Sequence, residues 1–361
     1  MSNLKWQLDY NDGLFLHLPL GHDISGSVFF KLKLKRYVAD MQNGVVRFKE
    51  SLTYLDYKRV IELCQHETVK QGIILCIRQA LTDYINVREM HLDARSRLGV
   101  ELKHRDEKLH ERFYEYRYVV DNAMSRKLRE KQMWDSFFMC AMRKSGNFSV
   151  PGSGKTASVL GMYAYMKKKD IMRRIVVICP KNAFGSWIDE FCICFADNEP
   201  LKCFNIHSSA YKSSRDRKRA IQLESGNCNL FLFNYEAVDT YSREIISLID
   251  EKTLLVFDEV HKVKRIDGMY AQAAVEIAEN AQYVVAMTGT PIPNAYTDIY
   301  NFLHILFPYE YHDFFNFSPA LLRNPSPKDR VDINDKLQPF FVAPPKSSCK
   351  CQMLIQIFYY Q

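Results

Sequence analysis

Short runs of apolar residues, separated by longer polar or amphipathic stretches, dominate the middle and later parts of the chain. Four of these runs are Ile175–Cys179, Leu230–Phe233, Leu254–Phe257 and Val284–Met287. Each is rich in β-branched or aromatic residues and does not alternate with polar residues, which is typical of strands buried on both faces of a parallel sheet. The pattern therefore predicts an α/β fold with a central, mainly parallel sheet.

The first third of the chain has a different pattern. Gly13–Leu18 and Gly26–Leu34 alternate or run apolar between glycines, which predicts strands. Asn43-Gly44 followed by a short apolar run predicts a hairpin turn, and from about Leu55 the apolar spacing becomes helical. We therefore expect a small α+β N-terminal module over residues 1–120, although its residues do not indicate what it binds.

Residues 149–156 read Ser-Val-Pro-Gly-Ser-Gly-Lys-Thr and precede an apolar helical stretch. In this pattern two glycines let the backbone approach phosphate oxygens and point N–H groups at them. The lysine reaches the β- and γ-phosphates, the threonine hydroxyl binds Mg²⁺, and the following helix presents its positive end. The strict pattern has glycine where this chain has Ser149, but its core is intact. We therefore expect a nucleoside triphosphate to bind Gly152, Ser153, Gly154, Lys155 and Thr156.

Two carboxylates, Asp258 and Glu259, directly follow the apolar run that ends at Phe257. They are therefore expected at the carboxyl end of a buried strand, where ligands of open α/β sheets bind. Asp258 would hold Mg²⁺ through water, and Glu259 would orient and deprotonate the water that attacks the γ-phosphate. An acidic pair alone would be a weak signal, because such pairs are common in solvated loops.

These motifs belong to a longer series whose order resembles the Swi/Snf-like ATPases of helicase superfamily two, which are DEAD/DEAH-type proteins. The resemblance extends from about residue 126 to about residue 345 and implies a RecA-like P-loop NTPase lobe at residues 121–310. Residues 311–361 would lead toward a second lobe. The matching features are the phosphate loop, the Cys179-Pro180 turn, Trp187 with Glu190-Phe191, the strand end Asn234-Tyr235-Glu236, Asp-Glu-Val-His at 258–261, and Thr-Gly-Thr-Pro-Ile-Pro-Asn at 288–294 ahead of Leu303 and Leu306-Phe307-Pro308.

The resemblance also implies roles for individual residues. Gln132 would contact adenine, and Lys155, Thr156, Asp258 and Glu259 would carry out the ATP chemistry with Mg²⁺. The nucleotide site would be coupled to nucleic acid by His261, Thr288 and Thr290. Lys181, Asn234 and Tyr235 would lie on the nucleic-acid face. The family typically moves along double-stranded DNA without fully separating its strands, so duplex DNA is the expected partner.

The sequence departs from the family pattern in two places. Val150-Pro151 replaces an acidic residue and a methionine, and Ala343–Lys346 stands where an Arg-x-x-Lys signature is usual. We expect the second lobe, with its arginine fingers, to be missing from a chain of 361 residues. Because such a finger is worth about a thousandfold or more in rate, the chain alone should bind ATP but hydrolyse it weakly.

Two other functions stay open. The chain could be a non-catalytic ATP- or DNA-binding regulator that associates with a protein supplying the second lobe, or it could be a lobe of an RNA helicase. Among DNA translocases, the family analogy points to bacterial motors found near restriction or phage-defence genes.

Composition changes this interpretation little. The chain is 47% hydrophobic with a net charge of +7, and it has no apolar run near the roughly 20 residues that span a bilayer. It also has no signal-peptide pattern at its N-terminus, so we expect a cytoplasmic protein that does not contact a membrane. The ten cysteines lack zinc-site spacing and are expected to be reduced thiols. The basic cluster at 212–219 is equally consistent with a DNA-backbone contact and with a solvated loop.

Overall fold

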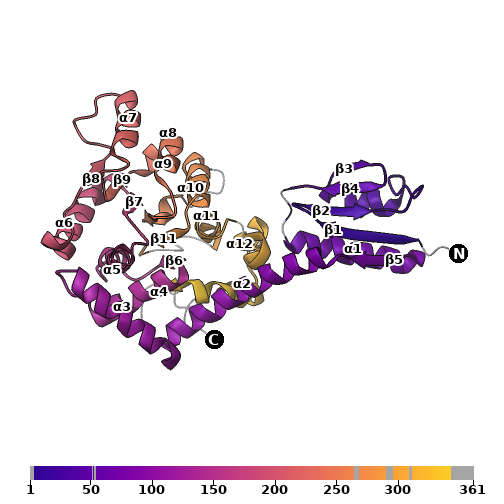
Figure 1. The fold of residues 1–361 in the computed structure, drawn as a ribbon, viewed down its shortest axis with the longest axis horizontal. Coiled ribbons are helices and arrows are strands. Elements are labelled where there is room, and N and C mark those ends of the chain that lie inside the picture. The colour runs from indigo at the N-terminus through magenta and orange to yellow at the C-terminus, as the bar shows by residue number, and fades with distance from the viewer. Residues whose placement is uncertain are drawn as a thin grey trace. The chain divides into compact units, whose positions relative to one another are not determined.

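A computed structural model describes residues 4–50, 52, 54–263, 268–289, 296–308 and 311–342. The chain forms two compact units (Figure 1). Residues 1–94 with 312–316 form one, the N-terminal unit, and residues 95–311 with 317–361 form the other, which we call the lobe. Helix α2 (Gln79–His104) contributes residues to both. The boundary that the sequence pattern puts at about residue 120 stays a prediction.

The lobe is built on a seven-stranded sheet whose described strand pairs are all parallel. This arrangement confirms the prediction of a central parallel sheet. Its order is β12-β6-β11-β10-β7-β9-β8, and the apolar runs named above are its central strands. The strands are β6 (Lys144–Asn147), β7 (Arg174–Ile178), β8 (Cys203–Asn205), β9 (Leu230–Phe233), β10 (Thr253–Asp258), β11 (Tyr283–Met287) and β12 (Phe341–Val342).

Helices cover both faces of this sheet (Figure 1), which explains why its central strands are buried along nearly their whole length. On one side α3 (His110–Ala123), α4 (Glu130–Met142) and α6 (Phe184–Phe195) contact α5 (Lys155–Lys168). A second group packs around α10 (Met269–Glu279). Its members are α8 (Tyr235–Thr240), α9 (Ser242–Leu248) and α11 (Ile299–Leu306), and the lobe also contains α7 (Ser214–Glu224), α12 (Pro319–Arg323) and α13 (Pro327–Leu337).

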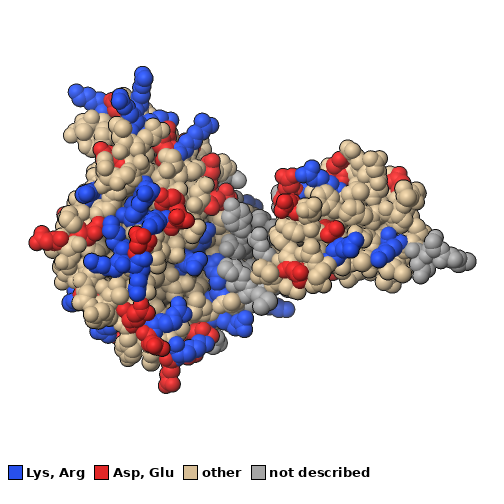
Figure 2. All heavy atoms as spheres, viewed as in Figure 1, with Lys and Arg blue, Asp and Glu red and all other residues tan. Residues whose placement is uncertain are grey.

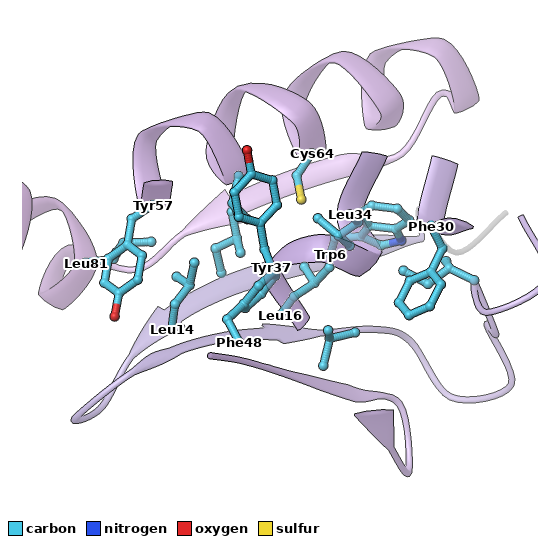
Figure 3. Close-up of a cluster of buried hydrophobic side chains, with 14 of the residues drawn as sticks. Trp6, Leu14, Leu16, Phe30, Leu34, Tyr37, Phe48, Tyr57, Cys64 and Leu81 are labelled. Carbon is cyan, nitrogen blue, oxygen red and sulfur yellow. The ribbon is translucent and has the colours of Figure 1, made fainter. Parts of the chain in front are cut away.

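The N-terminal unit contains a five-stranded sheet in the order β3-β4-β2-β1-β5 and the helix α1 (Tyr54–Gln71). Among the described strands of this sheet, β1 and β5 pair in parallel and the other pairs are antiparallel. Side chains from alternate strand positions form a core with α1, and Figure 3 shows Trp6, Leu14, Leu16 and Phe48 within it. The strands are β1 (Lys5–Tyr10), β2 (Leu14–His17), β3 (Val38–Gln42), β4 (Val45–Phe48) and β5 (Ile74–Ile77).

The hairpin prediction in this unit is confirmed, because Asn43 and Gly44 join β3 to β4 with φ values of 50° and 76°. Both values are positive, as a two-residue type I′ turn requires. The strand prediction for Gly26–Leu34 is wrong. Phe30–Leu34 forms a π-helical turn, followed by a 3₁₀ turn at Lys35–Tyr37.

The physical reason for this difference lies in how the segment starts and which residues it buries. The Ser27 hydroxyl accepts a hydrogen bond from the Phe30 N–H at 3.0 Å, which favours a helical start. Phe30 and Leu34 are both buried, whereas Lys31 and Lys33 are exposed. A spacing of four residues between core side chains suits a helix as well as a strand, so alternation over so short a stretch did not discriminate between them.

Residues beyond 310 also take part in the lobe. Phe341 and Val342 add the short strand β12 beside β6, and the Phe341 ring stacks on Phe148 at 4.7 Å between centroids. Gly146 makes this possible, because a Cβ there would come within 2.3 Å of the Phe341 ring. Among the described residues, no helix is long and apolar enough to cross a membrane.

Candidate functional site

Apart from Gln132, which lies in α4, the expected functional residues follow strands of the parallel sheet. Parallel strands end at the same edge, so the loops after β6, β7, β9, β10 and β11 lie close together. Strand β10, which ends in Asp258, lies at the centre of this group between β11 and β7. The phosphate loop follows β6, one strand beyond β11. Sheet topology therefore brings together residues that are about a hundred positions apart in sequence.

The phosphate loop has the backbone shape that an anion site needs. Gly152 and Gly154 adopt φ values of 78° and 83°, in a region that favours glycine. Gly154 has a second constraint, since a Cβ there would come within 2.0 Å of the Gln132 side-chain nitrogen. No described side chain caps the start of α5, so its first N–H groups are available to an anion. The buried Ser153 hydroxyl has no hydrogen-bond partner among the described residues.

Lys155 is the first residue of α5 and folds back over the loop. Its Nζ donates to the Ser149 carbonyl oxygen at 3.0 Å. Partial burial lowers the pKa of Lys155, while the charges of Glu259 and Asp258 oppose that shift. The lysine of the first motif thus lies within electrostatic reach of the acidic pair of the second.

Gln132 contacts the loop directly. Its side-chain oxygen accepts from the Arg129 N–H at 3.0 Å at the start of α4, and its Nε2 donates to the Ser153 carbonyl at 3.0 Å. The side chain is only 3% exposed. Gln132 therefore ties α4 to the phosphate loop, and its contact with adenine stays a prediction.

Sequence reasoning missed a polar cluster on α4 beside the loop. Lys131 Nζ lies 2.7 Å from the Asp135 carboxylate and 3.4 Å from the Ser149 hydroxyl. The Asn147 side chain accepts from the Ser149 N–H at 3.2 Å. Burial raises the pKa of Asp135, and its interaction with Lys131 opposes this shift. The i, i+4 spacing of Lys131 and Asp135 was a detectable pairing signal, but their contact with the loop depends on the packing of α4.

Asp258 is held by both its carboxylate and its backbone. Trp187 donates its indole N–H to Asp258 Oδ2 at 3.0 Å, and the Glu259 N–H donates to Oδ1 at 3.0 Å. The Tyr235 hydroxyl donates to the Asp258 carbonyl oxygen at 2.8 Å. Burial raises the pKa of Asp258, and the Trp187 hydrogen bond works in the opposite direction. Because Trp187 matched the family pattern without an assigned role, its contact with Asp258 was not predicted.

Glu259 lies in a small cluster with two of the residues expected to couple the site. The Thr288 hydroxyl donates to Glu259 Oε2 at 3.1 Å, and His261 Nδ1 lies 3.2 Å from the same oxygen. His261 Nδ1 is also 3.0 Å from the Thr288 hydroxyl. The His261 hydrogen bond is the main cause of the lowered pKa of Glu259. Glu259 adopts φ of 53°, a strained value for a residue with a side chain. Thr290 lies outside the described residues.

The three residues expected on a nucleic-acid face differ in exposure. Lys181 is exposed at the start of a 3₁₀ turn after β7. Asn234 and Tyr235 are 6% and 4% exposed, which leaves little of their side chains for a nucleic acid. Asn234 Oδ1 lies 2.9 Å from His207 Nε2, and its side-chain nitrogen donates to Glu236. A nucleic-acid contact by any of the three stays a prediction.

The geometry of the site fits a nucleoside triphosphate with Mg²⁺. The open start of α5 and the Ser153 hydroxyl, which has no partner within the described part of the chain, provide donors for phosphate. Thr156, in the first turn of α5, and Asp258 offer the oxygen ligands that Mg²⁺ prefers. The fold and this strand-end arrangement define the lobe as a RecA-like P-loop NTPase.

Comparison with protein families gives the particular class. The model of the SNF2-related domain matches residues 149–353, more than half of the chain. The chain therefore belongs to the SNF2-related family, in which ATP is the nucleotide used, and the Swi/Snf resemblance is confirmed.

The curated relatives are much longer than this chain. The probable ATP-dependent DNA helicase CHR23 of Arabidopsis thaliana is 24% identical over 169 residues, covering 46% of this chain and 15% of that protein. The SWI/SNF chromatin-remodeling complex subunit snf22 of Schizosaccharomyces pombe is 22% identical over 191 residues, 51% of this chain and 11% of its own length. A probable global transactivator of Orgyia pseudotsugata multicapsid polyhedrosis virus is 28% identical over 156 residues, with 43% and 29% covered.

A solved structure supports the fold. The Sulfolobus solfataricus SWI2/SNF2 ATPase core in complex with dsDNA matches 61% of this chain and 45% of that chain, with a TM-score of 0.50 and 20% identity. At this identity the match establishes the fold of the lobe, and activity has to be argued from the site.

Proposed function

We propose that this chain contains the ATP-binding lobe of a Swi/Snf-like, DNA-dependent ATPase and translocase. One observation carries the proposal: the phosphate loop that anchors Lys155 follows β6, the pair Asp258-Glu259 follows the end of β10, and both strands pair in parallel with β11, so the two motifs lie at one edge of the sheet. A phosphate-binding lysine beside two carboxylates at a strand end is the arrangement that phosphoryl transfer to water needs.

Each residue of the site has a proposed part in that reaction. Gly152, Ser153, Gly154 and Lys155 bind the phosphates, and Thr156 and Asp258 hold Mg²⁺, which would neutralise developing charge on the phosphates. Glu259 orients the attacking water and accepts its proton. Gln132 adds an adenine contact from its position beside the loop.

His261, Thr288 and Thr290 form the proposed link from this site to nucleic acid. Two of them already contact Glu259, since the Thr288 hydroxyl and the His261 ring share its Oε2. A shift of β11 or of the turn that contains His261 would therefore change the environment of the proposed base. Such a shift is a physical route by which bound DNA could affect ATP turnover.

Duplex DNA is the nucleic acid we propose. The SNF2 core of Sulfolobus solfataricus matched above is described as a complex with dsDNA. Figure 2 shows Lys and Arg side chains projecting from the top of the lobe, where Figure 1 places α7. This helix carries Arg215, Arg217, Lys218 and Arg219. Such cations can bind a phosphate backbone without reading sequence, as can the exposed Lys181.

The lobe is proposed to work with a second RecA-like lobe, supplied by another part of the full protein or by a partner protein. Arginine fingers from that lobe would stabilise the transferring phosphoryl group. We therefore expect this chain alone to bind ATP and to hydrolyse it slowly. The cytoplasm is the proposed location.

The test is nucleotide binding and ATP turnover by the same preparation, with and without duplex DNA. Lys155→Ala should abolish binding, and Glu259→Gln should retain binding but remove any turnover. Lys168→Ala is the matched control, because it removes an exposed lysine from the end of the same helix. Equal binding by wild type and Lys155→Ala would contradict the site assignment. Stronger stimulation by RNA than by duplex DNA would favour an RNA helicase, and binding without turnover even with a second lobe would favour a regulator.

A restriction or phage-defence setting is also part of the proposal and is supported by family analogy alone. Phage should form fewer plaques on bacteria that carry the complete system with the wild-type chain than on bacteria that carry it with the Lys155→Ala variant. Equal plaque numbers would contradict this setting while leaving the ATPase assignment intact.

A further inference from the structure

Two hydrogen bonds with buried donor residues converge on Asp258 from segments that follow other strands. Trp187 Nε1 donates to the carboxylate oxygen Oδ2 at 3.0 Å, and the Tyr235 hydroxyl donates to the main-chain oxygen at 2.8 Å. The donor side chains belong to residues that are 1% and 4% exposed. Buried donors of this kind are seldom exchanged for water, so both bonds restrict Asp258.

The two donors come from different places in the sheet. Trp187 lies in α6, which follows β7 and the 3₁₀ turn that starts at Lys181. Tyr235 is the first residue of α8 and directly follows Asn234 at the end of β9. Because β7 lies between β9 and β10, Tyr235 reaches over the end of β7, a lateral span of about 10 Å for two strand spacings.

We infer that Trp187 and Tyr235 are positioning residues for Mg²⁺-dependent nucleotide binding, which hold the Asp258 carboxylate and the strand end beneath it in one orientation. The inference rests on the proposed function, in which Asp258 holds Mg²⁺. Trp187 occupies one lone pair of Oδ2 and so restricts the carboxylate plane. With the Glu259 N–H on one lone pair of Oδ1, one lone pair on each oxygen is left for Mg²⁺ or its water. Tyr235 fixes the backbone from which that carboxylate extends.

The same two bonds connect Asp258 to the proposed nucleic-acid face. Lys181 and Asn234 are at the starts of the segments that carry Trp187 and Tyr235. A displacement of either segment by bound DNA would lengthen a hydrogen bond to Asp258 and change its hold on Mg²⁺. Partners that orient a metal ligand are typically worth 10- to 100-fold in metal affinity, which sets the expected size of the effect.

The first test measures how nucleotide binding by the full chain depends on Mg²⁺ concentration. Binding is measured from the fluorescence anisotropy of a directly excited fluorescent ADP analogue. Trp187→Phe removes the indole N–H and keeps an aromatic ring. We expect it to raise the half-saturating Mg²⁺ concentration about 10- to 100-fold, with unchanged ADP affinity in EDTA. A merely structural role for Trp187 would weaken binding equally with and without Mg²⁺.

Trp134→Phe is the matched control for this variant. Trp134 is 8% exposed, and its Nε1 donates to the Glu130 carboxylate at 3.0 Å. The substitution therefore removes the same kind of hydrogen bond from a different part of the lobe, and the Mg²⁺ dependence should stay at the wild-type value. Thermal melting of both variants checks that each is folded.

Tyr235→Phe is a second, smaller change, because it removes only the hydroxyl group. It should raise the half-saturating Mg²⁺ concentration by roughly two- to tenfold, the effect of a single hydrogen bond. Tyr163→Phe is its control, since the Tyr163 hydroxyl donates to the Arg173 carbonyl at 3.2 Å within the same lobe.

A spectroscopic measurement is independent of affinity. The chain has three tryptophans, so selective ¹⁵N labelling gives three indole signals, and the Trp187 signal is the one absent from Trp187→Phe. This signal should shift when Mg²⁺ is added to the ADP-bound protein, while the Trp134 signal stays in place.

Three outcomes are distinguishable. Wild-type protein that binds no nucleotide at any Mg²⁺ concentration would overturn the proposed function and this inference with it. Normal wild-type binding, with Trp187→Phe matching Trp134→Phe, would overturn only the inference. A selective rise of the half-saturating Mg²⁺ concentration in Trp187→Phe and, more weakly, in Tyr235→Phe would support it.

Discussion

The seven-stranded sheet of the lobe and the five-stranded sheet of the N-terminal unit differ in the direction and the burial of their strands. In the lobe, described strands such as β7, β9 and β11 run parallel and are buried along their whole length. In the N-terminal unit most pairs are antiparallel, and strands such as β2 bury only alternate residues. The lobe sheet is thus covered on both faces, whereas the N-terminal sheet has one core face.

This difference explains where a site can form. In an all-parallel sheet every strand delivers the residue after it to the same edge, so loops from β6, β10 and β11 meet. In an antiparallel sheet successive strand ends lie at opposite edges, and short hairpins such as Asn43-Gly44 leave no room for a functional loop. We therefore expect changes at strand ends of the lobe to affect function and core changes in the N-terminal unit to affect stability.

The largest effect is expected from Glu259→Gln. Removing the proposed base should lower the DNA-stimulated turnover of the protein with both lobes by about 10²- to 10⁴-fold, while ATP binding is retained. Single-turnover hydrolysis with pre-bound ATP measures the chemical step separately from binding. Turnover within twofold of wild type would show that another group acts as the base.

Phe48→Ala should have a large effect of a different kind. Phe48 is 2% exposed in the core of the N-terminal unit (Figure 3), and truncating a buried phenylalanine typically costs about 3–5 kcal/mol. Urea unfolding should show this loss, while ATP affinity measured in the absence of urea stays at the wild-type value. A parallel loss of ATP affinity would mean that the two units are not independent in function.

Gly154→Ala should weaken nucleotide binding about 10- to 100-fold, since a Cβ would strain the backbone at φ 83° and meet Gln132. Gly44→Ala is the comparable change in the N-terminal unit, where φ is 76°. It should lower stability without an effect on nucleotide affinity. Calorimetric titration with ATP measures the nucleotide affinity of both variants. Equal ATP affinities of Gly154→Ala and Gly44→Ala would contradict the expected difference between the two units.

The smallest effect is expected for Asp250→Asn, just before β10 at the opposite edge of the lobe sheet. Burial raises the pKa of Asp250, but a Thr253 hydrogen bond and the charges of Arg173 and Arg174 outweigh it and lower the pKa overall. A lowered pKa stabilises the fold above the ordinary pKa of aspartate, and this contribution is lost as pH falls through the folded-state value. Because Asp250 is partly exposed, Asn should cost less than about 1 kcal/mol at neutral pH and nothing at acidic pH. Thermal melts at both pH values test this.

Local sequence was a good guide where one explanation fitted each pattern. The buried apolar runs predicted the lobe strands. Asn43-Gly44 predicted a hairpin turn with two positive φ values, which few other pairs of residue types adopt as readily. It failed at Gly26–Leu34, where one apolar spacing suited both a strand and a helical turn. Local sequence also did not predict the contacts of Lys131 and Asp135 with the phosphate loop, because these residues and their partners in the loop lie on different elements.

The sequence by itself determined the phosphate loop, the acidic pair after β10 and the class of fold, because glycine conformation, strand burial and motif order are local or sequential properties. Only the tertiary structure decided which side chains hold those motifs in place. Trp187 and Tyr235 reach Asp258 across 71 and 23 residues of sequence. That distance is closed by strand order and helix packing, and both depend on the burial of the whole sheet.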